Sequence, residues 1–113
     1  MKSLQNSLKS IRDILNTTSA EGRIWHYTRP AGVTPPWVVW QESDEAESHY
    51  TNNRKDLQQV YGTIDCYTQT EYDPLLDEIQ DALNAAGVGF RLNSVQYEDE
   101  TRLIHYEWEF AVS

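Results

Sequence analysis

Residues 60–87 read VYGTIDCYTQTEYDPLLDEIQDALNAAG, in which a two-residue alternation gives way to a helical repeat. The alternation predicts a strand, which we place over 57–69, with two sets of side chains on opposite faces: Val60, Gly62, Ile64 and Cys66 against Tyr61, Thr63, Asp65 and Tyr67. After it, Asp73 can cap a helix, Pro74 suits its first turn and Gly87 can end it. Apolar residues then follow at helical spacing: Leu75, Leu76, Ile79, Ala82, Leu83 and Ala86.

Upstream of this strand and helix, the sequence predicts another helix and two short strands. Apolar residues recur at helical spacing from Leu4 to Leu15, with polar residues between them. Arg23–Tyr27 has the composition of a short strand, and Trp37–Gln41 follows a pair of prolines that suits the start of a strand. The order up to residue 87 is therefore α-β-β-β-α.

Downstream, two further strands are predicted over Gly89–Tyr97 and Arg102–Val112, joined by an acidic turn at 98–101. In the second of these, alternate apolar residues share one face: Ile104, Tyr106, Trp108, Phe110 and Val112. The full order α-β-β-β-α-β-β predicts an α+β fold, with two helices packed on one face of a largely antiparallel sheet of four to five strands. At 113 residues, we expect a single domain over 1–113.

Charge and hydropathy exclude several classes of partner. The chain carries nine basic and eighteen acidic residues, so we expect no tight binding to the phosphate backbone of DNA. No apolar run approaches the roughly 20 residues that a membrane-spanning helix needs, so we expect a soluble protein with no membrane partner.

Residues that could carry chemistry are few and scattered. Cys66 falls on the apolar face of its strand, where packing is a better explanation than nucleophilic catalysis. His26, His49 and His105 lie in three separate segments without the spacing of a metal site. The acidic clusters near 44–47 and 98–100 have the character of solvated turns. We therefore expect no enzymatic activity, no catalytic residues, no metal and no cofactor.

Aromatic residues are more numerous than one thin core requires, and the excess favours contact with other proteins. Ser43–Asp56 is a long polar connection, which we expect to be mobile in the free subunit and ordered by contact with a neighbouring copy or another partner protein. Our candidate residues for a subunit or partner interface are Trp40, His49, Tyr50, Arg54, Lys55, Asp65 and Tyr67.

The order of these segments resembles the tail terminator or tail completion proteins of long-tailed bacteriophages, including the lambda-type terminators. The resemblance extends over nearly the whole chain and lies in its residue types and their order. It rests on the first helix and on four further segments: Gly22-Arg23-Ile24-Trp25, Pro36-Trp37-Val38-Val39-Trp40-Gln41, Val60 to Thr68 leading into Tyr72-Asp73-Pro74-Leu75-Leu76, and His105 to Val112.

This resemblance implies a structural protein that forms a ring of six copies, caps the head-proximal end of the tail tube and joins tail to head. The implied partners are other copies of the chain, the tail tube protein and a head-completion or connector protein, while DNA passes through unbound. The implied location is the virion tail, reached from the host cytoplasm during assembly. Two alternatives stay open: a head-completion or neck connector protein, and a small non-phage binding or enzymatic α+β domain.

Overall fold

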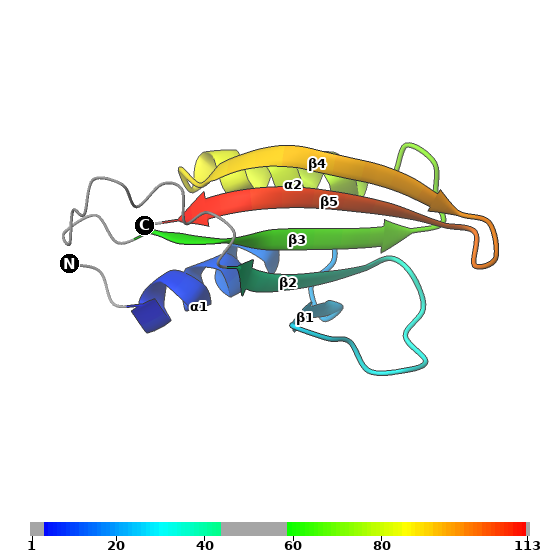
Figure 1. Cartoon of the computed structure of the whole chain (residues 1–113), viewed down its shortest axis with the longest axis horizontal. Coiled ribbons are helices and arrows are strands. Elements are labelled where there is room, and N and C mark those ends of the chain that lie inside the picture. Colours follow the sequence, from blue (N-terminus) through cyan, green and yellow to red (C-terminus); the bar gives the residue numbers. More distant parts are fainter. Residues whose placement is uncertain (1–3, 44–58, 113) are drawn as a thin grey trace.

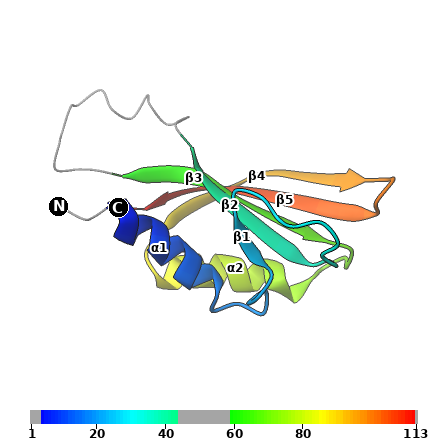
Figure 2. The same cartoon turned by 90° about the horizontal axis from the view of Figure 1, so that it is seen from below.

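A computed structural model describes residues 4–43 and 59–112 of the chain. It contains α1 (Leu4–Leu15), β1 (Ile24–His26), β2 (Trp37–Ser43), β3 (Val60–Thr68), α2 (Pro74–Ala85), β4 (Gly89–Glu98) and β5 (Leu103–Val112). The strands form one sheet in the order β1-β2-β3-β5-β4, and both helices cover the same face of it (Figures 1 and 2). The predicted α+β fold and its order of elements are confirmed.

The sheet is mixed, since β1 pairs parallel to β2 while every other pair is antiparallel. β1 is shorter than the predicted Arg23–Tyr27 because Tyr27 adopts a left-handed backbone conformation with φ 79°, which ends the extended chain. β2 continues to Ser43, two residues beyond its predicted end, because Glu42 and Ser43 still pair with β3. β3, with alternate residues buried along its whole length, lies at the centre of the sheet between β2 and β5.

α2 begins and ends where the sequence predicts. The Asp73 carboxylate accepts hydrogen bonds from the backbone N–H of Leu75 at 2.9 Å and from the Thr68 hydroxyl at 2.6 Å, which ties the helix to the end of β3. At the other end, Gly87 has φ 74°, a left-handed conformation that glycine adopts without strain. The amphipathic helix is thus fixed at both ends.

The core lies between the helices and the sheet, where the apolar side chains of both layers meet. Ile11 and Leu15 of α1 and Ile79 and Leu83 of α2 are fully buried against it. On the sheet, the alternation predicted for β3 and β5 is observed, with Ile64, Cys66, Trp108, Phe110 and Val112 buried on the helix side. The Nε1 of Trp108 donates a hydrogen bond to Oε1 of Gln80 at 2.9 Å, which satisfies its one polar atom.

Candidate functional site

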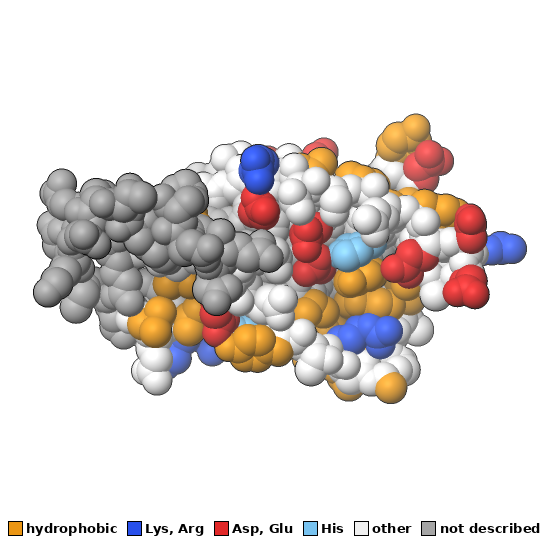
Figure 3. Space-filling view, viewed as in Figure 1, with side chains coloured by type: hydrophobic (Ala, Val, Ile, Leu, Met, Phe, Trp, Pro, Cys, Tyr) orange, Lys and Arg blue, Asp and Glu red, His pale blue; other side chains and the backbone are white. Residues whose placement is uncertain are grey.

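The face of the sheet opposite the helices, here called the outer face, is uncovered by any helix (Figure 2). The strand registers place on it side chains of mixed character: Trp37, Val39 and Gln41 from β2, Tyr61, Thr63, Asp65 and Tyr67 from β3, His105, Glu107 and Glu109 from β5, and Arg91 and Gln96 from β4. Figure 3 shows this face, with a histidine among acidic side chains and a group of apolar and basic side chains beside it.

An aromatic row crosses the outer face from β2 to β5. The rings of Trp37 and Tyr67 have centroids 5.3 Å apart, and those of Tyr67 and His105 are stacked at 4.2 Å. The guanidinium of Arg29, from the segment between β1 and β2, lies 4.1 Å from the centroid of Trp37. Trp37 is consequently only 4% exposed, although its strand face has no helix over it.

Polar pairs hold the neighbouring side chains of the outer face in place. His105 Nε2 is hydrogen-bonded to Oδ1 of Asp65 at 2.7 Å, and Arg91 donates to Oε1 of Glu109 at 2.5 Å. The hydrogen bond to Asp65 raises the pKa of His105; partial burial opposes this, and the negative charges of Asp65 and of nearby Glu107 add to it. The protonated imidazole is thus the form that this face favours.

The pair of His105 and Asp65 makes stability depend on pH. Because the pKa of His105 is raised by folding, its stabilising effect is complete below the unfolded value of about 6.5 and is lost as pH rises through the folded pKa. We expect His105→Asn to cost about 1 kcal/mol near pH 5.5 and progressively less toward pH 8.5, since the site is partly exposed. Urea unfolding at several pH values measures this difference.

Asp65→Asn is the matched control, since it leaves the imidazole and removes its charged partner. It should flatten the pH dependence as His105→Asn does, and the double variant should add little to either change. A wild-type pH profile that both single variants leave unaltered would contradict the assignment.

A second cluster, which sequence reasoning missed, lies where β1 meets β2. The ring of His26 is stacked between those of Tyr27 at 3.8 Å and Trp40 at 3.9 Å, and its Nε2 is hydrogen-bonded to Glu42 at 2.7 Å. The Tyr27 hydroxyl donates to the same carboxylate. Partial burial raises the pKa of Glu42, but the hydrogen bonds from Tyr27 and His26 outweigh it, so the net pKa is lowered. The cluster holds an ionised carboxylate and brings no nucleophile to it.

The residues predicted to form an interface fall into three groups. Asp65 and Tyr67 lie together on the outer face, where both are half-buried. Trp40 lies on the helix side and is only 3% exposed, so its indole packs in the core of the subunit. The other four candidates lie outside the described residues: His49, Tyr50, Arg54 and Lys55. Of the connection Ser43–Asp56, only Ser43 lies within them. The interface assignment itself stays a prediction.

The cysteine is inaccessible to a substrate. Cys66 is fully buried at the centre of the sheet, and this burial, with smaller effects from Asp73 and Asp65, raises the pKa of its thiol to about 12. Among the described residues, no group of three or more histidine, cysteine or acidic side chains is placed to hold a metal ion.

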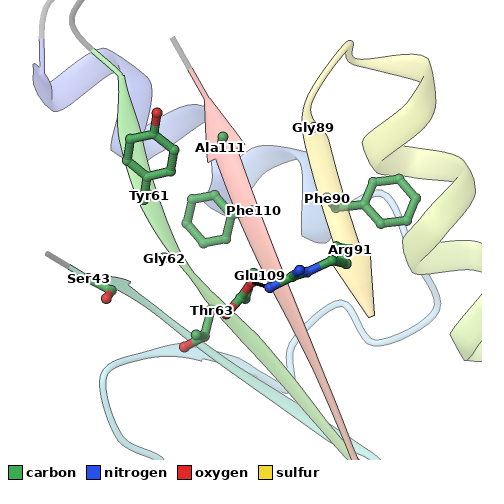
Figure 4. A pocket seen from close by; sticks show the side chains of 10 residues that line it. All are labelled: Ser43, Tyr61, Gly62, Thr63, Gly89, Phe90, Arg91, Glu109, Phe110 and Ala111. Carbon is green, nitrogen blue, oxygen red and sulfur yellow. Dashed lines mark hydrogen bonds and ion pairs between the residues drawn. The ribbon is translucent and has the colours of Figure 1, made fainter. Parts of the chain in front are cut away.

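A hollow of about 500 Å³ opens near the ends of β2, β3, β4 and β5. In Figure 4, the Arg91–Glu109 ion pair lies across it, the ring of Phe110 faces Gly62, and Phe90 points away toward α2. The remaining polar groups of the lining, Ser43, Tyr61 and Thr63, are not arranged around a nucleophile or a base. Among the described residues, the lining of the hollow thus consists of an ion pair, apolar side chains and separate hydroxyl groups.

The comparison with protein families identifies the family to which the chain belongs. A family model described as Tail completion protein gp17 matches residues 2–112. The chain belongs to this family. The resemblance drawn from the order of segments is thereby confirmed for tail completion proteins, and a structural role in a phage tail follows from membership of the family. No curated protein matches the chain.

Membership of the family also indicates where the protein is located. The tail completion family consists of structural proteins of the phage tail, which places this member in the tail of the virion. Neither helix of the described chain combines the length and the apolar character that crossing a bilayer requires.

Proposed function

We propose that this tail completion protein forms a ring of six copies that caps the head-proximal end of the tail tube, stops its elongation and then receives the head. The observation that carries the proposal is the family match over residues 2–112, because completing a tail requires a protein that ends the tube. The outer face, which neither helix covers, supports an assembly role.

The proposed partners are other copies of the chain, the tail tube protein, and a head-completion or connector protein. On the outer face, Tyr67 stacks on His105 and near Trp37, and aromatic side chains are enriched at protein interfaces. The runner-up function, a neck connector that binds the portal side, would use the same face. The two differ in the phenotype of a phage that lacks the protein: tubes of uncontrolled length for a terminator, and free tails of normal length for a neck connector.

The proposal predicts that adding the purified protein to polymerising tail tube protein yields capped tubes that no longer elongate from one end. Negative-stain electron microscopy should show closed rings of the protein at tube ends, and light scattering should show assembly at high concentration. Tubes that elongate at an unchanged rate, with only monomers both alone and beside the tubes, would count against the ring and against the cap.

We further propose that the DNA duplex passes through the opening of the ring without being held. Each copy carries a formal net charge of -9, so a ring of six would repel phosphates rather than exchange their counterions. The assembled ring should therefore give no shift of a short duplex in an electrophoretic assay at physiological salt. A stable complex under those conditions would refute free passage.

A further inference from the structure

β4 is a long strand at the edge of the sheet that buries almost nothing. Eight of its ten residues are exposed, whereas its neighbour β5 has no exposed residue. Three of them are large apolar side chains: Leu92, Val95 and Tyr97, exposed by 47%, 50% and 59%. Natural proteins protect edge strands with charges, prolines or covering elements, so an apolar edge of this length indicates a surface that another chain covers.

A β-bulge brings these three side chains to one face. Side chains alternate between the two faces along a regular strand, so Leu92 would point to the face opposite that of Val95 and Tyr97. The register shifts between Leu92 and Ser94, and all three therefore lie opposite helix-side residues of β5: Trp108, Tyr106 and Ile104. The fold thus gathers apolar area on a face of the edge strand where α2 does not cover it.

The turn that leads into α2 exposes a further large side chain. Tyr72 is 86% exposed there. In Figure 2 this segment lies on the helix side of the sheet, at the start of α2. We call Leu92, Val95 and Tyr97 the β4 patch.

The two sides of the molecule differ in charge. Residues 60–112, which form β3, α2, β4 and β5, carry two basic and eleven acidic side chains, and seven of the eleven lie off the outer face, outside Asp65, Glu98, Glu107 and Glu109. Residues 4–29, which form α1 and β1 at the opposite side of the sheet, carry four basic and two acidic side chains. All four of those basic residues are exposed: Lys9, Arg12, Arg23 and Arg29. We call Lys9, Arg12 and Arg23 the basic edge.

We propose that the β4 patch of one copy docks against the basic edge of the next copy. Opposite charges at the two sides favour this head-to-tail contact, whereas pairing two β4 patches around a twofold axis would bring acidic surfaces together. Exposed apolar residues are present at both sides, since Leu4 of α1 and Tyr27 after β1 are 51% and 55% exposed. A contact between two different surfaces repeats from copy to copy and closes into a ring when the rotation allows. This inference rests on the proposed ring and names the surfaces that build it.

Two variants test the contact, each removing one surface. The patch variant carries Leu92→Gln and Val95→Gln, and the edge variant carries Arg12→Glu and Arg23→Glu. All four side chains are exposed, so both variants should keep the thermal unfolding of the wild type to within a few degrees. The matched control is Gln96→Ser, which alters the opposite face of the same strand.

Each variant alone should associate at least about tenfold more weakly than the wild type and remain monomeric where the wild type and Gln96→Ser form rings. Mixed in equal amounts, the two should form one-to-one dimers and nothing larger, because each supplies the surface that the other lacks. Native mass spectrometry distinguishes monomers, dimers and rings directly.

Three results would overturn the inference. If the patch variant forms rings as readily as the wild type, the surface is wrong although the ring stands. If the folded variants stay monomeric when mixed, the two surfaces do not contact each other. If the wild type forms no ring either alone or on tail tubes, the inference and the proposed function fall together.

Discussion

Gly62→Ala should destabilise the protein by about 2–3 kcal/mol, although it adds a single methyl group. Gly62 is buried in β3 opposite Phe110 of β5, whose ring packs against the bare backbone. An alanine Cβ there would lie 2.6 Å from the ring and closer still to the backbone oxygen of Gln41, which cannot move without disturbing the pairing of β2 with β3. Urea unfolding followed by tryptophan fluorescence measures the loss.

Gly89→Ala provides the matched control for this prediction. Gly89 lies in β4, and a Cβ at this position would meet only the backbone oxygen of Ala111 at 3.9 Å, an ordinary contact. The substitution should leave the free energy of unfolding within about 0.5 kcal/mol of the wild type. Similar losses at the two glycines would show that the close packing at Gly62 is not the cause.

A larger loss, about 3–5 kcal/mol, is expected for Trp108→Ala. Trp108 is 1% exposed at the centre of β5, and its indole fills the space between the sheet and α2. Truncation leaves a cavity and removes the indole N–H that donates a hydrogen bond to Oε1 of Gln80. Single domains have only about 5–15 kcal/mol of stability, so the variant should be partly unfolded at physiological temperature in calorimetry.

Trp108→Phe separates the two contributions, because it keeps most of the ring volume and loses the hydrogen bond. We expect it to cost clearly less than Trp108→Ala, and Trp25→Ala, at a half-buried position in the short β1, to cost less as well. Equal losses at Trp25 and Trp108 would mean that burial in the core does not determine the effect.

Local signals in the sequence were enough for the elements and their order. The bounds of α2 follow from residues at its own ends: Asp73, Pro74 and Gly87. The alternation around Ile64 likewise assigns the two faces of β3 without reference to other strands. The family, too, was evident from the order of residue types. Such signals act within a few residues of each other, which is the range over which a sequence pattern can be interpreted.

Features that depend on distant contacts were not predictable. The parallel pairing of β1 with β2 depends on the path of the segment that connects them. The stack of Trp40 on His26 exists only because of that pairing. Trp40 was proposed for an interface from its residue type, while its place on the helix side follows from the register with Ile64. The bulge between Leu92 and Ser94 has no local signature, so the apolar face of β4 could not be seen in the sequence.

The buried cysteine gives the protein an internal reporter. Cys66 is the sole thiol of the chain, and its side chain is buried in the core on the helix side of the sheet, so a thiol reagent can reach it only when this core opens. Its rate of modification therefore follows the opening of the core between the helices and the sheet, with no label that disturbs the surface. Compared between free subunits and assembled tails, this rate would tell how strongly incorporation into the virion suppresses that opening.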